Sequence, residues 1–186
     1  MGEYRSSLLK GVKGTVLEIG FGTGLNLVHY PPEVKVLNVV EPNLGMKKKA
    51  QKRIAQSSIK VGNNLGSAEK LPFENQTFDS VVSTFTLCSI PDVELALWEI
   101  HRVLKNKGKF FFLEHGLSPD AKIQKKQHRW TPLNKKIADG CHLNRDMAGL
   151  VDGAGFHLLD LKKFYSPGIP KMVGFFYQGI AEKVEG

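Results

Sequence analysis

The feature that most constrains this chain is a glycine-rich turn directly after a short apolar run. The run Thr15–Ile19 is followed by glycines at positions 20, 22 and 24. Such a run is typical of a buried parallel strand, and glycines after it let the backbone approach a ligand closely. Position 25 is Leu, where the dinucleotide-binding fingerprint G-x-G-x-x-G requires a third glycine. The sequence therefore predicts a strand-and-turn ligand site of a different kind.

Two acidic residues indicate what this ligand carries. Glu18 lies inside the apolar run, and Glu41 ends the next one, 21 residues after Gly20. A buried carboxylate is costly unless it meets a cation or good donors, so Glu18 predicts an ammonium group near the turn. An acid at the offset of Glu41 accepts hydrogen bonds from a ribose diol. Together the two acids predict a ligand with a ribose and a cationic group.

Helical and extended patterns alternate along the rest of the chain, which predicts a parallel sheet with helices on both faces. Further strands are expected over residues 35–40, 59–61, 79–84 and 109–114. Helices are expected from about residue 25, over 45–57, over 93–104 with Lys107-Gly108 as its stop, and over 145–154 with Asn144 as its cap. Two extended runs, about 156–164 and 172–183, flank a Pro/Gly-rich turn and predict a terminal antiparallel hairpin. The expected fold class is α/β, a Rossmann-like doubly wound sheet of seven strands, mostly parallel with a C-terminal antiparallel hairpin.

Length and composition predict one domain spanning residues 1–186. The net charge of +8 is concentrated in residues 101–145, which hold eleven Lys or Arg and three acids. Charge runs of this kind are usually solvated, and aromatic residues are sparse here, so no nucleic-acid partner is expected. Contact with a membrane surface or an acidic small molecule stays open as an alternative.

The two cysteines, Cys88 and Cys141, lack metal-binding or paired spacing, so neither a disulfide framework nor a metal site is expected. No apolar run approaches the roughly 18 residues of a membrane-spanning helix, and the first residues lack the apolar core of a secretory signal. A cytoplasmic protein is the expectation.

Several motifs match a known family in order. They are the Glu18–Gly24 turn, the 66–73 segment GSAEKLPF, the 78–88 segment FDSVVSTFTLC and the 99–109 segment EIHRVLKNKGK. The chain thereby resembles the class I S-adenosylmethionine-dependent methyltransferases of the methyltransferase type 11 group over about residues 14–115. One departure is Ser67, where the family often has Asp for the adenine amino group; a main-chain contact from Ala68 would survive it.

The resemblance implies S-adenosylmethionine as the cofactor and a single methyltransferase domain. It also implies these cofactor-binding residues: Glu18, Gly20, Phe21, Gly22, Thr23, Gly24, Asn26, Glu41, Pro42, Asn43, Ser67, Ala68, Glu69, Thr84, Phe85 and Cys88.

A closer resemblance continues into the second half. Leu113-Glu114-His115, Trp130 and the 139–146 segment DGCHLNRD are similar to the methyltransferase-like thiol S-methyltransferases. Members of that subgroup carry an N-terminal membrane anchor and a longer N-terminal part, and neither is expected here, because the first strand is predicted about a dozen residues after residue 1. The implied acceptor is a small molecule, a thiol or another lipophilic nucleophile. A methyltransferase of phospholipid amines or quinone precursors, and a non-catalytic cofactor-binding module, are the alternatives.

Residues 116–145 are expected to form a mobile, irregular lid and the acceptor wall, because the core motifs are taken up by the cofactor. His115 and His142 are the candidate catalytic bases, since an imidazole can accept a thiol proton near neutral pH. Ordinary surface or capping roles are the alternatives for both histidines.

Overall fold

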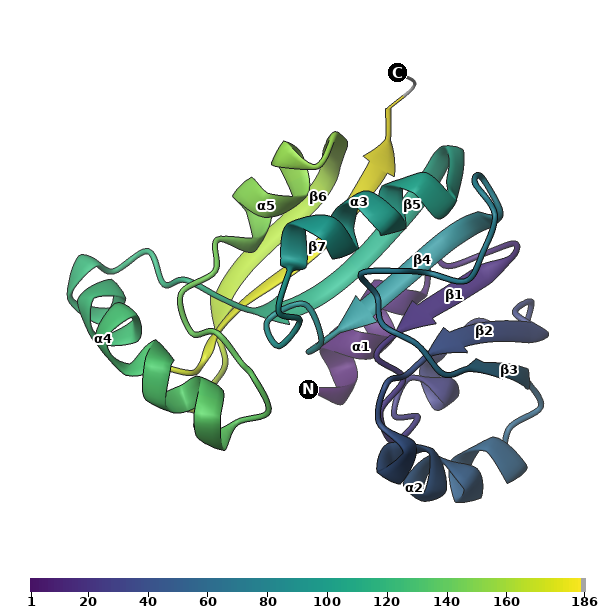
Figure 1. Ribbon diagram of the computed structural model, residues 1–186, viewed down its shortest axis with the longest axis horizontal. Coiled ribbons are helices and arrows are strands. Elements are labelled where there is room, and N and C mark those ends of the chain that lie inside the picture. The colour runs from purple at the N-terminus through teal and green to yellow at the C-terminus, as the bar shows by residue number, and fades with distance from the viewer. Residues whose placement is uncertain (185–186) are drawn as a thin grey trace.

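The computed structural model describes residues 1–184 and contains one seven-stranded sheet (Figure 1). The strand order is β3-β2-β1-β4-β5-β7-β6. The first five strands pair in parallel, whereas β7 runs antiparallel to both β5 and β6. The predicted seven-stranded α/β sheet with a C-terminal antiparallel pair is confirmed. The strands are β1 (Val16–Ile19), β2 (Val36–Val40), β3 (Lys60–Asn64), β4 (Phe78–Thr84), β5 (Leu104–His115), β6 (Phe156–Tyr165) and β7 (Phe175–Lys183).

Helices cover both faces of this sheet because the central strands are apolar on both sides. Phe110 and Phe112 of β5 join one core cluster, while Phe111 and Leu113 join a second cluster on the opposite face. Side chains of α3 and α5 pack into the first cluster, and those of α1 and α2 into the second. The helices are α1 (Gly2–Leu9), the short 3-10 helix η1 (Leu27–His29), α2 (Leu44–Ala55), α3 (Val93–Val103), α4 (Ala121–Ile137) and α5 (Met147–Gly153).

The helix expected from residue 25 is reduced to the single turn η1, so that prediction was wrong. Tyr30 is extended, as a residue before proline prefers, and Pro31 follows it. The buried Asn26 side chain, directly before η1, donates to Glu18. Residues of this segment therefore contact the site residue Glu18 instead of extending a helix.

Helix α3 ends at Val103, and Lys107-Gly108 is not its stop. Leu104 already pairs with Phe78 in the sheet, and Lys107 adopts a positive φ of 61° inside an irregular start of β5. Pairing of Leu104 in the sheet thus ends the helix before the chain reaches the glycine at position 108.

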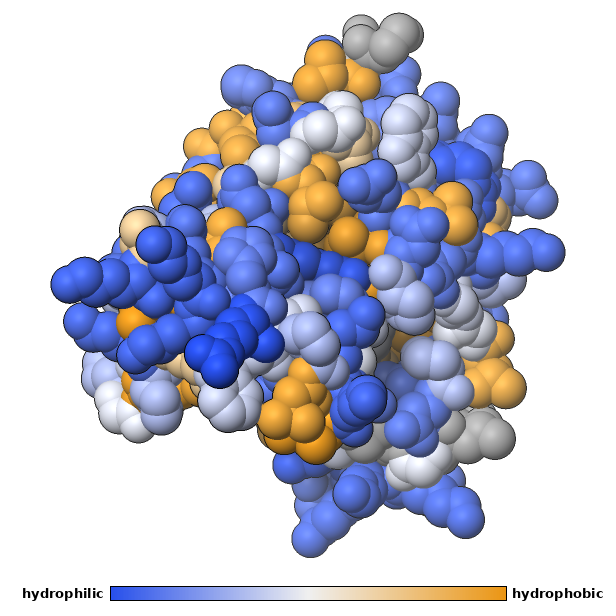
Figure 2. Space-filling model, turned by 60° about the vertical axis from the view of Figure 1, so that its left-hand side comes forward, coloured by the Kyte–Doolittle hydropathy of each residue, from blue (hydrophilic) through white to orange (hydrophobic). Residues whose placement is uncertain are grey.

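The segment 116–145 is not irregular, because most of it is the 17-residue helix α4. Asp120 caps this helix by accepting from the backbone N–H groups of Lys122 and Ile123. Its buried side chains, Gln127 and Thr131, are polar, so the sequence shows no apolar stripe to reveal it. Figure 1 shows α4 standing out at one side of the sheet, and Figure 2 shows a largely hydrophilic surface on that side.

Asn144 does not cap the following helix. Helix α5 begins at Met147 with Asp146 at its N-cap position. The Asn144 side chain instead contacts Thr131 and His128 of α4. No helix within residues 1–184 has the length and apolar character needed to cross a bilayer.

Candidate active site

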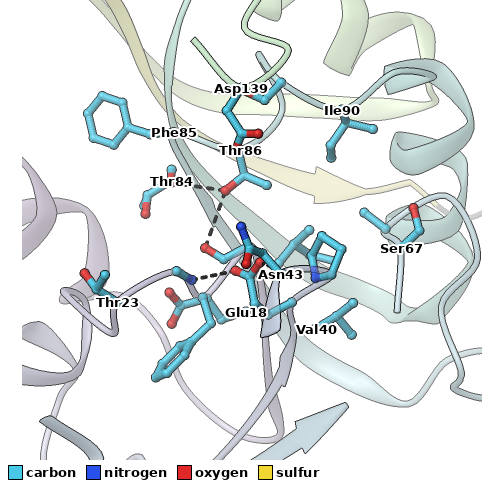
Figure 3. Close-up of a pocket in the computed structure, with 18 of the residues that line it drawn as sticks. Glu18, Thr23, Val40, Asn43, Ser67, Thr84, Phe85, Thr86, Ile90 and Asp139 are labelled. Carbon is cyan, nitrogen blue, oxygen red and sulfur yellow. Dashed lines mark hydrogen bonds between the residues drawn. The ribbon is translucent and has the colours of Figure 1, made fainter. Parts of the chain in front are cut away.

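A cavity of about 390 Å³ opens at the carboxyl ends of β1, β2 and β4 (Figure 3). This volume lies in the range of small-molecule sites, and the carboxyl edge of a doubly wound sheet is where such folds bind ligands. Figure 3 shows Glu18 and Asn43 toward one end of the cavity, with Thr86 and Asp139 toward the other.

The glycine turn after β1 forms the floor of the cavity. Gly20 and Gly22 both have positive φ, 70° and 54°, which glycine adopts without strain. A Cβ at Gly20 would lie 2.1 Å from the Thr86 hydroxyl, so this position has no room for a side chain. A Cβ at Gly22 would meet nothing nearer than 4.0 Å, so it would project into open space. The backbone at Gly22 is therefore presented directly to a ligand.

Glu41 is fixed beside this turn by two backbone donors. The N–H of Gly22 donates to Glu41 Oε2 at 2.7 Å, and the N–H of Asn43 donates to Oε1 at 2.9 Å. A carboxylate offers about four acceptor positions, so these two bonds leave capacity for a pair of hydroxyl groups. The geometry suits the vicinal diol of a ribose.

Glu18 lies buried under the turn and is held by neutral donors. Tyr30 Oη donates to it at 2.7 Å and Asn26 Nδ2 at 2.9 Å. Burial disfavours the charged carboxylate and raises the pKa of Glu18 to about 7, although these hydrogen bonds and the charge of Arg5 oppose the shift. An additional cation from a ligand would stabilise the ionised form.

Arg5, on α1, is a cavity residue that the sequence analysis missed. It donates to Asn26 Oδ1 and, at 2.7 Å, to Thr84 Oγ1, and its guanidinium lies 5.1 Å from the centre of the Phe85 ring. Burial lowers the pKa of Arg5, against the charge of Glu18. No local pattern marks α1 as part of the site, so only the tertiary structure reveals this cation.

A second buried carboxylate shapes the loop that leaves β4. Glu114 accepts from the Ser83 hydroxyl at 2.8 Å and from the Thr86 N–H at 3.0 Å, and more weakly from the Cys88 N–H at 3.4 Å. Burial raises the pKa of Glu114, while these donors favour the charge. Phe85 in this loop has a φ of 57°, an uncommon backbone state for an aromatic residue. Glu114 thus fixes the loop whose next residues line the cavity.

Ser67 and Glu69 form another wall of the cavity. The Ser67 hydroxyl donates to Glu69 Oε2 at 2.5 Å, and the Asp92 N–H donates to Glu69 Oε1 at 2.8 Å. Between them, Ala68 is buried and contributes an apolar surface. A flat ring bound at this wall could pack against the Ala68 side chain and form hydrogen bonds with the ordered residues beside it.

Most residues expected to bind the cofactor line this cavity. Three of them do not: a Cβ at Gly24 would meet Phe21 rather than the cavity, Asn26 bonds Glu18, and Cys88 is buried in the core. Further lining residues that were not predicted are Arg5, Ile19, Leu25, Val40, Thr86, Ser89, Ile90, Pro91 and Asp139. Asp139 is the contribution of the 116–145 segment to the cavity.

The two predicted bases lie beside the cavity rather than in its lining. His115 is buried, with Nδ1 3.8 Å from Cys141 Sγ, and its Nε2 has no partner among the residues that the structure describes. His142 is half-buried, with Nδ1 3.2 Å from the Cys88 carbonyl, and burial lowers its pKa. Trp130 lies on α4, 47 % exposed.

The residues present fit S-adenosylmethionine. The open space at Gly22 suits close approach of a ligand, and the free acceptor capacity of Glu41 suits a ribose. The buried acid Glu18 suits an ammonium group, and Arg5 brings a cation to the same end of the cavity. A nucleoside joined to an amino acid carries each of these groups.

Comparison with known proteins agrees. Residues 17–112 match the family described as Methyltransferase domain. Thiol S-methyltransferase TMT1B of Rattus norvegicus is 34% identical over 170 residues, which covers 84% of this chain and 67% of that protein. Demethylmenaquinone methyltransferase of Symbiobacterium thermophilum is 34% identical over 53% of the chain and 41% of that protein. Phosphatidylethanolamine N-methyltransferase of Cereibacter sphaeroides is 31% identical over 55% of the chain and 51% of that protein.

Solved structures share the fold at low sequence identity. The YcgJ protein of Bacillus subtilis superposes with a TM-score of 0.79 at 18% identity and covers both chains fully. A geranyl diphosphate methyltransferase in complex with SAM has a TM-score of 0.75 at 15% identity, covering 98% of this chain and 84% of that one.

The chain spans about two thirds of the length of the thiol S-methyltransferases it matches. The matched family model, these relatives and the shared fold lead to one conclusion: this chain belongs to the S-adenosylmethionine-dependent methyltransferases of the methyltransferase domain family.

Proposed function

We propose that the chain transfers the methyl group of S-adenosylmethionine to the sulfur of a small, lipophilic thiol. The observation that carries this proposal is the extent of the similarity. An alignment that covers 84% of the chain has to run through residues 116–145, whereas the quinone and phospholipid relatives match 53–64% of the chain. The segment that we propose to determine the acceptor thus lies within the similarity to the thiol S-methyltransferases.

In this proposal the residues that line the cavity would hold the cofactor. Glu41 would bind the ribose diol, and residues 67–69 would bind the adenine ring. Glu18 would bind the ammonium group, and Arg5 would face the carboxylate of the same amino-acid end. The acceptor would then approach from the part of the cavity near Thr86 and Asp139, which these contacts leave unused.

The bound cofactor supplies a methyl group already activated by a positively charged sulfur. The chain therefore has to orient the acceptor, exclude water and favour the thiolate. His142 is half-buried, and the buried His115 has an Nε2 without a partner in residues 1–184, so both remain proposed acceptors of the thiol proton.

Helix α4 is the proposed outer wall of the acceptor site. Gln127 anchors it by donating to the carbonyls of Gly116 and Met172, both at 3.1 Å, while Trp130 and Leu133 stay exposed among lysines. An exposed surface of apolar and basic side chains suits contact with an anionic membrane, from which a lipophilic acceptor could enter.

A turnover assay with methyl-labelled cofactor tests the proposed acceptor. The panel pairs each lipophilic thiol with the alcohol of the same skeleton, and adds an ethanolamine phospholipid and a demethylated quinol. Labelled thioether, with little label in the matched alcohol, supports the proposal. Label mainly in the phospholipid or the quinol would overturn it, and cofactor binding without label in any acceptor would favour a binding module.

Single replacements test the proposed acceptor wall. His115→Ala, Trp130→Ala and His142→Ala should lower methyl transfer and leave cofactor affinity nearly unchanged. Trp98→Ala is the matched control, because Trp98 is an exposed tryptophan on α3, 62% accessible and outside the cavity lining. If all three variants keep the activity of the control, the segment is only a connection.

A further inference from the structure

Two cysteines that are 53 positions apart in sequence meet beside the cavity. The N–H of His142 donates to the carbonyl of Cys88 at 2.8 Å, which brings the backbones at Cys88 and Cys141 together. The Cys141 side chain packs against the core cluster that contains Cys88. A disulfide joins Cα atoms about 4.4–6.8 Å apart, so it forms only between cysteines whose backbones lie close together. Both cysteines are free in this structure.

The surroundings make the two thiols chemically unequal. Cys141 is half-buried, and its pKa is lowered well below the ordinary range by the hydrogen bond from Cys88, by His115 Nδ1 at 3.8 Å and by the nearby His142. Cys88 is buried, and its pKa is raised by the same shared hydrogen bond, by burial and by the charge of Glu114. The Cys141 sulfur is therefore the nucleophile of the pair, because a thiolate reacts and a thiol does not.

Arg145 completes the set of charged groups around the pair. Arg145 donates to the carbonyls of Leu87 and Ile90. Burial lowers the pKa of Arg145, and negative charge on either of the two nearby thiols opposes that shift. His115, His142 and Arg145 thus oppose Glu114 around the two sulfurs. The three basic side chains outnumber the single acid, and Cys141, unlike Cys88, lies within the basic segment 101–145. Negative charge is therefore favoured on Cys141.

We propose that Cys141 and Cys88 form a reversible thiol–disulfide site that reacts with small-molecule disulfides. The Cys141 thiolate attacks one sulfur of the disulfide, forms a mixed disulfide and releases the other half as a thiolate. Cys88 then loses its proton and attacks the Cys141 sulfur, which releases the second half. Two protein thiols are oxidised, one small disulfide is reduced to two thiols, and the two protons pass to the released thiolates.

This chemistry goes beyond methyl transfer and has a direct structural consequence. Ser89 and Asp139 line the cavity, one residue after Cys88 and two residues before Cys141. The disulfide would therefore join two walls of the cavity covalently. A disulfide reagent would act on the protein in the absence of any cofactor, so this proposal can fail or succeed independently of the thiol acceptor.

The test treats the reduced full chain with hydroxyethyl disulfide and follows intact mass under non-reducing conditions, with peptide mapping. The wild-type chain should lose two hydrogens in mass, keep no adduct and yield a Cys88–Cys141 cross-linked peptide. Cys88→Ser should instead retain one adduct, at Cys141. Cys141→Ser should react at Cys88 at least about tenfold more slowly, because a buried thiol with a raised pKa has little thiolate. A stable adduct on the wild-type chain, or a cross-link only between two chains, would overturn the proposal.

A second measurement needs no cysteine replacement and so does not depend on whether those variants fold. The rate of iodoacetamide reaction at Cys141 in the wild-type chain should reach half its maximum at a pH well below the value of about 8.5 for a free thiol. His115→Gln should move that midpoint upward, whereas His128→Gln, on the exposed face of α4, should leave it in place. A midpoint near the free-thiol value, or equal shifts in both histidine variants, would contradict the assignment.

Discussion

Replacing Glu18 by Gln tests how the buried acid under the glycine turn contributes to cofactor binding. The carboxylate accepts from Tyr30 and Asn26 and lies where an ammonium group of the ligand would complete its charge balance. Glutamine has nearly the same shape: its carbonyl oxygen can accept from Asn26, and its NH2 group can donate to the Tyr30 oxygen, which reverses that hydrogen bond. The substitution therefore removes the charge while leaving the packing of the cavity floor in place.

The magnitude follows from the raised pKa. Burial raises the pKa of Glu18 to about 7, so the empty site binds a proton there as the pH falls through that value. A cationic ligand needs the ionised form, so its binding has to displace that proton at lower pH. The ionised fraction falls about eightfold between pH 7.5 and pH 6, and wild-type affinity should fall by about the same factor. The Glu18→Gln variant should bind more weakly at pH 7.5 and lose most of this pH dependence.

Isothermal titration calorimetry at the two pH values, on wild type and variant, measures the effect directly. Ionisation of the cofactor's own groups affects both proteins equally. The difference between their affinities as a function of pH therefore reports the ionisation of Glu18. The reasoning is refuted if wild type and variant show the same ratio of affinities. The same pKa also predicts a contribution to stability. An unfolded chain ionises Glu18 near pH 4.5, so the difference in free energy of unfolding between wild type and Glu18→Gln should shift against the wild type by roughly 1.4 kcal/mol per pH unit from there to about pH 7.

Four further changes test other parts of the site. Glu41→Ala should weaken cofactor binding by roughly 1–3 kcal/mol in calorimetry, with Glu41→Gln, which keeps an acceptor, in between; unchanged affinity in both would defeat the ribose assignment. Gly22→Val should abolish detectable binding, because its side chain would enter the cavity from a left-handed backbone; retained binding would contradict the close approach. Arg5→Met should move the midpoint of the Glu18-dependent pH profile above 7, since the opposing cation is gone, and an unmoved midpoint would remove Arg5 from the site. Gly116→Ala should lower the free energy of unfolding in urea by about 1–3 kcal/mol, because its Cβ would lie 2.5 Å from the Arg145 carbonyl; wild-type stability would show that the backbone there yields easily.

The sheet and most of the cavity could be predicted because their signals are local. A buried strand, a glycine turn and an acid at a fixed offset are all readable within the first 41 residues, and Glu18, Gly22 and Glu41 do line the cavity. The terminal hairpin was equally visible, because its two extended runs flank a turn. Such features depend on neighbours in sequence, so the sequence alone carries them.

The missed features depend on contacts between distant segments. Arg5 reaches the cavity only because α1 packs on the sheet, and helix α4 is held by the polar side chains of Gln127 and Thr131 rather than by an apolar stripe. Cys88 and Cys141 have no informative spacing, yet the fold brings the backbones at these two positions together. Hydrophobic periodicity and motif spacing do not reveal contacts between residues that are far apart in the sequence.

The most direct test of the account is a crystal structure of the chain with S-adenosylhomocysteine and a lipophilic thiol bound together. The account predicts the ribose hydroxyls at Glu41, the amino group at Glu18 and the thiol sulfur on the side of the cavity formed by Thr86 and Asp139. A product whose ribose lies away from Glu41, or a thiol bound on the far side of α4 with no path to the cofactor sulfur, would contradict it.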